Sequence, residues 1–169
     1  MNKKIEKELN KQLNAELYSA YLYLSMSAYA ASINLQGFSN WLKTQHDEEQ
    51  AHAMKLYDYI IDRNGRVNFD KIDAPKNNWD GIIDVFENVL SHEKHVTSLI
   101  NELVNIAFEE KDHATVNLLQ WFVTEQVEEE ASASELLDQL KLVDGKGAGL
   151  FMLDREAKLR VFIPIDNNN

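Results

Sequence analysis

The stretch Glu48-Glu49-Gln50-Ala51-His52 lies in the middle of a long segment whose apolar residues recur at helical spacing. Glu49 and His52 are three residues apart, so they share one face of the predicted helix. A carboxylate and an imidazole on one helical face can bind the same metal ion. Alone, such a pair is a weak indication of a metal site. Its meaning depends on whether other segments bring further ligands to the same level.

Length and composition restrict the class of protein. The 169 residues suffice for one domain with a buried core, and only six Gly and two Pro interrupt a sequence rich in helix-forming residues. No run of 18 apolar residues and no signal-peptide core occur, so we expect a cytoplasmic protein that does not enter a membrane. The absence of cysteine excludes disulfides, thiolate zinc sites and iron–sulfur clusters. A net charge of −11 argues against nucleic acid as a partner and suits a protein that attracts cations.

The apolar pattern predicts an all-α protein with four long helices and a short fifth one. The predicted ranges are 4–32, 38–63, 80–110, 113–143 and 150–159, followed by a polar tail at 160–169. Asn64-Gly65 is predicted to end the second helix, because either residue tolerates the left-handed backbone of a helix end. Asp80 and Asp112 are predicted to cap the third and fourth helices.

The loop lengths indicate the topology. Only a few residues join helices one and two, and three and four, so each pair is predicted to form an antiparallel hairpin. The middle loop, at 65–79, has about 15 residues and could span ~50 Å when extended. A helix of about 26 residues is ~39 Å long. The loop can therefore cross the whole bundle, although this length also permits it to fold back locally.

Each long helix carries polar residues on its apolar stripe, where a polar side chain needs an explanation. In chain order they are Glu16, Glu49 and His52, Glu93, and Gln126 and Glu129. They lie ~16–24 Å along helices of ~40 Å, so they should meet at mid-height whichever way each helix runs. Glu49 follows Glu16 by 33 residues, and Gln126 follows Glu93 by the same number, which predicts two related hairpins.

Carboxylates gathered in a bundle core repel one another, and burying each charge is costly unless it is paired. No Lys or Arg lies on these stripes at that height, so two metal ions bridged by shared carboxylates are the natural counter-charge. Oxygen-rich ligation with one imidazole suits iron or manganese better than a structural zinc. The alternative for each acid taken alone is a solvated residue at the edge of its stripe.

The strings around these residues resemble those of prokaryotic non-haem ferritins. The resemblance is carried by Ala-Glu-Leu-Tyr-Ser at 15–19, Glu-Glu-Gln-Ala-His at 48–52, His92-Glu93, and Leu-Gln-Trp-Phe-Val-Thr-Glu-Gln at 119–126. It implies a single ferritin-like domain over 1–169, built as a four-helix bundle with one long crossover loop and a short C-terminal helix.

The resemblance also implies roles for individual residues. The first iron would be held by Glu16, Glu49 and His52, and the second by Glu49, Glu93 and Glu129, with Gln126 lining the site. A third iron position would be formed by Glu48, Glu125, Glu128 and Glu129. Tyr23 would lie beside the centre and supply an electron, whereas Trp121 could do the same or simply pack. Gln50 stands where bacterioferritins have a haem-ligating Met, so no haem is expected.

The expected function is that of a cytoplasmic ferritin, which stores iron and detoxifies it. Such a protein oxidises Fe(II) with O₂ or H₂O₂ at an intrasubunit di-iron ferroxidase centre and stores Fe(III) mineral. Storage takes place inside a homo-oligomeric cage, of about 24 subunits by the resemblance. One alternative is a rubrerythrin-like redox enzyme that retains its di-iron cofactor, although the lack of cysteine removes the rubredoxin relay. Another is a purely structural oligomer with an acidic core.

Overall fold

The computed structural model describes residues 1–164 and shows five helices and no strand in this range. Their bounds are α1 Lys3–Ser32, α2 Gln36–Asp62, α3 Ile82–Glu109, α4 His113–Leu142 and α5 Gly147–Ala157. The all-α prediction is confirmed, and every predicted helix end lies within three residues of the observed one. The predicted polar tail lies partly outside the described residues, since only 160–164 are described. The assignment of the whole chain to one domain stays a prediction.

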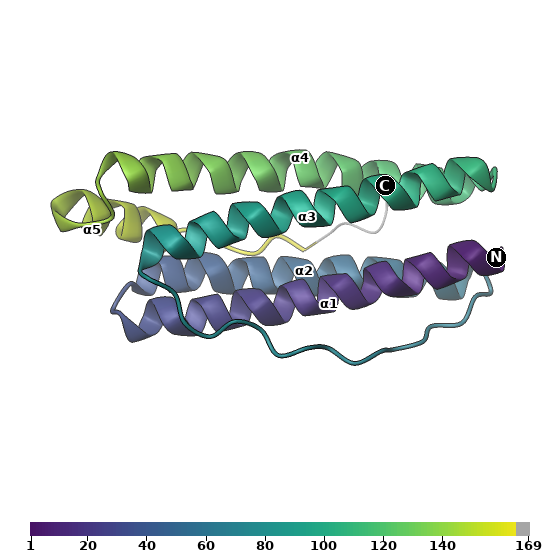
Figure 1. Ribbon diagram of the computed structural model, residues 1–169, viewed down its shortest axis with the longest axis horizontal. Helices are drawn as coiled ribbons and strands as arrows, with labels where there is room; N and C mark the ends of the chain where they lie inside the picture. The colour runs from purple at the N-terminus through teal and green to yellow at the C-terminus, as the bar shows by residue number, and fades with distance from the viewer. Residues whose placement is uncertain (165–169) are drawn as a thin grey trace.

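The four long helices form a bundle of two antiparallel hairpins, α1–α2 and α3–α4 (Figure 1). The segment between α2 and α3 runs along the full length of the bundle, so α3 begins at the end of the bundle where α2 also begins. The predicted crossover is therefore confirmed. Within residues 1–164, no helix combines the length and apolar character that crossing a lipid bilayer requires.

The crossover segment is held along the outer face of α1 by side chains of that helix. Near one end, Asn10 donates to the carbonyl of Arg66 at 3.0 Å and accepts from the amide of Asn68 at 2.6 Å. Near the other, the hydroxyl of Tyr29 donates to the carbonyl of Trp79 at 2.7 Å. These bonds satisfy backbone groups of a segment that has no strand or helix partner. Tyr29 is therefore partly covered by the segment that it holds, and its ring lies 5.3 Å from the ring of Trp79.

The helix ends follow the predictions with one exception. Asn64 takes the left-handed backbone (φ 54°) after α2, as predicted, and Asp112 accepts from the amide of Thr115 at 3.1 Å at the start of α4. Asp80 does not cap α3. The cap residue is Gly81 (φ 105°), and a carboxylate from the first turn, Asp84, accepts from the amide of Asp80 at 2.9 Å instead. An acid placed there also interacts favourably with the helix dipole.

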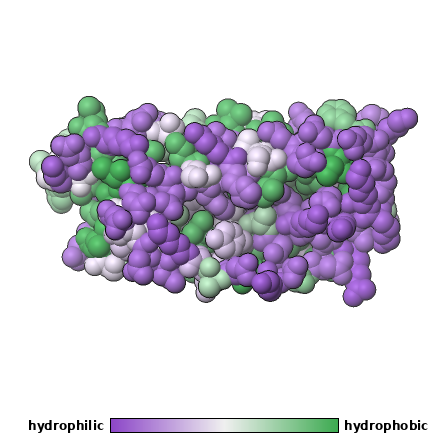
Figure 2. Space-filling view, viewed as in Figure 1, coloured by the Kyte–Doolittle hydropathy of each residue, from purple (hydrophilic) through white to green (hydrophobic). Residues whose placement is uncertain are grey.

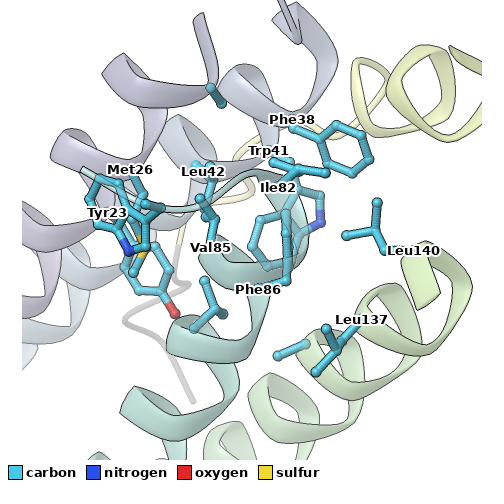
Figure 3. Packing of buried hydrophobic residues seen from close by; sticks show 14 of the residues in the cluster. Tyr23, Met26, Phe38, Trp41, Leu42, Ile82, Val85, Phe86, Leu137 and Leu140 are labelled. Carbon is cyan, nitrogen blue, oxygen red and sulfur yellow. The ribbon is translucent and has the colours of Figure 1, made fainter. Parts of the chain in front are cut away.

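The bundle core consists of two hydrophobic clusters, one toward each end. The cluster nearer α5 is shown in Figure 3, where Phe38, Trp41 and Phe86 pack at ring distances of 5.2 to 5.6 Å. The other contains Leu9 and Leu56 among residues from all four long helices. Each long helix runs without a break through both clusters. On each helix, buried polar residues lie between the part that belongs to one cluster and the part that belongs to the other. The tertiary fold thus leaves a polar layer at mid-height.

Helix α5 packs across the start of α2. The carboxylate of Asp154 accepts from the amides of Gly37 and Phe38 at 2.9 and 3.0 Å, and so supplies a cap that α2 lacks from its own sequence. The approach is close, because a Cβ added to Gly37 would lie 1.5 Å from the carbonyl oxygen of Asp154. A glycine is therefore required at residue 37.

Candidate metal centre

The six side chains predicted to converge are all buried in the polar layer. They are at most 8% exposed and come from all four long helices: Glu16, Glu49, His52, Glu93, Gln126 and Glu129. Each helix contributes residues from its inward face, so the packing that buries the leucines above and below also buries these groups. The predicted convergence is what the structure shows, although it does not test which side chains bind a metal.

Three of these groups form a set of potential metal ligands. One donor atom from each of Glu16, Glu49 and His52 can be chosen so that all three lie within 4.8 Å of one another. Nδ1 of His52 lies 3.5 Å from Oε2 of Glu49, three residues earlier on the same helix. The rings of Trp121 and Phe122 meet the imidazole edge-on at 5.4 and 6.0 Å and so restrict its orientation.

Neutral side chains donate a hydrogen bond to one carboxylate oxygen of each of three acids, Glu16, Glu129 and Glu93. Gln12 donates to Oε1 of Glu16 at 2.8 Å, and Gln45 donates to Oε2 of Glu129 at 2.7 Å. Tyr23 donates to Glu93 through its buried hydroxyl. The sequence analysis missed Gln12 and Gln45 as partners. A usable indication was present for Gln12, which precedes Glu16 by four residues, the spacing of neighbours on a helix. Gln45 contacts Glu129 across 84 residues, and no local spacing indicates that pair.

Gln126 has a different environment from the one expected. Its amide nitrogen donates to Oε2 and to the backbone carbonyl of Glu93, both at 3.2 Å, and to the hydroxyl of Thr97 at the same distance. These three bonds all use the amide nitrogen, which is a donor and not a metal ligand, so through them Gln126 positions Glu93. That Gln126 lines an iron site stays a prediction.

Several acceptor atoms of the cluster have no partner. Oε2 of Glu16, Oε2 of Glu49 and Oε1 of Gln45 are buried without a hydrogen bond from any described residue. Unpaired buried acceptors are rare and costly in native proteins. Oxygen acceptors and one imidazole are also the donor set that suits ions such as Fe(II). The residues present therefore fit a divalent cation.

Burial dominates the protonation of these acids. It raises the pKa of Glu16 to about 8, and the negative charge of Glu49 adds to the effect. Burial followed by the charge of Glu93 raises the pKa of Glu129 to about 7. The pKa of Glu49 is raised well above its usual value, first by burial and then by Glu93 and Glu129. The metal-free cluster thus retains protons that a cation would displace.

A second group of acids lies beside this cluster. Glu48, Glu125, Glu128 and Glu129 line a pocket of about 200 Å³, together with His52 and Arg160. The four acids predicted to form a third iron position are therefore brought together. Arg160 was not predicted there. The expectation that no Arg lies near the acids holds for the helical stripes, but this guanidinium comes from the segment after α5.

Residues 6–143 match the model of the ferritin-like domain family. The chain belongs to the ferritin family. It is 44% identical to a bacterial non-heme ferritin of Bacteroides fragilis, over 92% of this chain and 97% of the relative. It is 39% identical to the Campylobacter jejuni bacterial non-heme ferritin, over 94% and 95%. An engineered closed form of Archaeoglobus fulgidus ferritin superposes with a TM-score of 0.95 at 50% identity, covering 96% of this chain and 99% of that one. The open-pore ferritin of the same archaeon gives 0.94 at 49% identity, covering 95% and 99%.

The raised pKa of Glu16 predicts how the stability of this metal-free ferritin depends on pH. The folded state keeps a proton that the unfolded chain loses above its pKa of 4.5. The stability that this group contributes is therefore fully present below pH 4.5 and is lost as the pH rises to about 8, a change on the order of 5 kcal/mol. Glu16→Gln removes this titration, so its thermal unfolding midpoint should fall less between pH 5.5 and 8 than that of the wild type. Glu102→Gln, at an exposed acid, is the control, and equal falls in wild type and Glu16→Gln would contradict the prediction.

Proposed function

We propose that this ferritin stores iron and that the buried cluster is its ferroxidase centre, where two Fe(II) ions bind and are oxidised by O₂ or H₂O₂. The observation that carries this proposal is the position of Glu49. It lies within ligand distance of Glu16 and His52, and its pKa is also raised by the charges of Glu93 and Glu129. One carboxylate therefore interacts with both groups of potential ligands, as a bridge between two ions requires.

The proposed roles follow the sequence analysis with one change. Glu16, Glu49 and His52 would bind the first ion, which the short distances among their donor atoms support. Glu49, Glu93 and Glu129 would bind the second, which the mutual effect of their buried charges supports. Gln126 would act by holding Glu93, since its amide nitrogen faces that residue. Tyr23 would supply an electron during oxidation, and the hydrogen bond from its hydroxyl to Glu93 supports this role. Bound iron supplies the electrons for reducing the oxidant, and the acids release their retained protons as the ions bind.

Self-association into a closed shell is the second part of the proposal. Hydrophobic surface occurs at the end of the molecule that carries α5 (Figure 2). Phe151, Met152 and Leu142 are 62%, 70% and 86% exposed there. Large apolar side chains that are exposed together at one end of a molecule indicate contacts with partners. We infer a cage of about 24 subunits, located in the cytoplasm, with closed symmetry of the kind that homo-oligomers adopt.

The rubrerythrin-like alternative is not favoured, because the matched relatives and solved structures are named ferritins. A purely structural oligomer would also need the exposed apolar surface. It would not explain why buried carboxylate oxygens have no hydrogen-bond partner. These alternatives differ in two measurable quantities, the mass of the particle and the amount of iron that each subunit retains.

Aerobic titration with Fe(II) tests the proposal. We expect the absorbance of oxidised iron to rise with each addition well beyond two ions per subunit, while light scattering reports one large particle of constant protein mass. A retained redox cofactor would saturate near about two ions per subunit. A stable monomer or dimer of ~19–38 kDa across salt concentrations would contradict storage in a shell.

A further inference from the structure

Arg160 lies against the acidic pocket in a defined position. Its Nη2 is 2.5 Å from Oε2 of Glu48, and its guanidinium carbon lies 4.2 Å from the centre of the Trp41 ring. The side chain is only 23% exposed. A charged hydrogen bond and a cation–π contact together fix the guanidinium more firmly than an exposed ion pair would.

The backbone around Arg160 is also anchored. The segment after α5 turns back along the bundle (Figure 1), and the side-chain amide of Asn40 donates to the carbonyl of Arg160 at 2.9 Å. Phe162 and Ile163, which follow, line the same pocket as the four acids. This segment therefore forms one wall of the pocket and carries a positive charge into it.

Among the described residues that line the pocket, Arg160 is the one Lys or Arg. Its charge opposes the effect of burial, which is the larger influence and raises the pKa of both Glu48 and Glu129 to about 7. A cation bound between these carboxylates would interact with the same charges. A metal ion bound at Glu48 would lie close to the guanidinium of Arg160, and the two positive charges would repel each other, so Arg160 and the metal ion compete for Glu48.

We propose that Arg160 is an internal counter-cation that a metal ion must displace from Glu48 before it can occupy the acidic pocket. Arg160 thereby sets the affinity of this pocket for divalent cations. The inference rests on the proposed function, because the pocket adjoins the candidate ferroxidase centre through Glu129. Its consequence is an order of filling: the ferroxidase centre binds first, and the pocket binds weakly enough to pass iron on.

Calorimetric titration of the assembled protein with Zn(II), which is not oxidised, measures this affinity without any turnover. In the wild type we expect tight binding at the ferroxidase centre and a weaker step at the pocket. Arg160→Gln should tighten the weaker step about tenfold or more, because a positive charge next to the bound ion is removed. Arg160→Lys keeps the positive charge, so its pocket should bind Zn(II) nearly as weakly as the wild-type pocket does. Lys158→Gln, two residues earlier on an exposed side chain, is the control for net charge and should change nothing.

Trp41 provides a second measurement that does not depend on binding heats. In a background where Trp79 and Trp121 are replaced by Phe, the fluorescence of Trp41 reports on the guanidinium stacked against it. Filling the pocket with Zn(II) should change this emission when Arg160 is present and leave it unchanged in Arg160→Gln. The double variant Glu125→Gln/Glu128→Gln identifies the pocket step, because it removes that step and leaves tight binding intact.

The outcomes separate the two proposals. An unchanged weak step in Arg160→Gln, with tight binding intact, overturns the role of Arg160 and leaves the proposed function in place. Tight binding that survives Glu49→Ala, or that is absent from the wild type, overturns the ferroxidase centre and this inference with it. A tighter pocket step in Arg160→Gln, together with loss of the Trp41 response, supports the inference.

Discussion

Glu49→Ala should lose rapid Fe(II) oxidation, by about 100-fold or more in the initial rate, while the protein still assembles. Glu49 is the acid that interacts with both groups of potential ligands, so its removal weakens both proposed iron positions at once. Stopped-flow absorbance on anaerobically prepared Fe(II) mixed with O₂ measures the rate, and light scattering measures assembly.

The metal-free Glu49→Ala protein should unfold at a temperature near or above that of the wild type. The variant leaves a cavity but removes one of several mutually repelling buried acids. Asp58→Ala, at an exposed acid on the same helix, is the matched control and should keep the wild-type rate. Oxidation by Glu49→Ala at the wild-type rate would show that the centre lies elsewhere.

Gly37→Ala should destabilise the protein by about 3 kcal/mol and displace α5. The added Cβ would lie 1.5 Å from a backbone oxygen of Asp154, so a side-chain rotation cannot relieve the overlap. Displacement of α5 also removes the two hydrogen bonds by which Asp154 caps α2. The exposed apolar residues of α5 would move as well, so assembly should weaken in parallel with the thermal midpoint.

Gly147→Ala, at the first residue of α5, is the control for the effect of a glycine substitution. Its backbone is left-handed (φ 66°), but an added Cβ would meet nothing within 4 Å. We expect a cost of only ~1 kcal/mol from backbone strain, and normal assembly. Thermal unfolding compares the stability of the two variants, and light scattering compares their assembly. A wild-type unfolding midpoint for Gly37→Ala would refute the close packing of α5 against α2.

Local patterns in the sequence were enough for the helices and for the level of the metal centre. Apolar spacing determines which face of a helix is buried, and position along the helix determines height, so Glu16, Glu49 and Glu93 could be placed together without coordinates. Errors arose where neighbouring residues compete for one role. Gly81 rather than Asp80 caps α3, with Asp84 supplying the carboxylate.

What the sequence by itself determined was thus the set of helices, their order and the acids that converge at mid-height. Contacts between distant segments were decided only by the tertiary structure. Arg160 pairs with Glu48 across 112 residues, and Asp154 caps α2 at Gly37 across 117. No local period encodes such a pair, because each partner alone is an ordinary charged residue near a helix end or a surface. Their meeting depends on where α5 packs, which is set by the absence of a side chain at Gly37 and by the shape of the bundle that receives it.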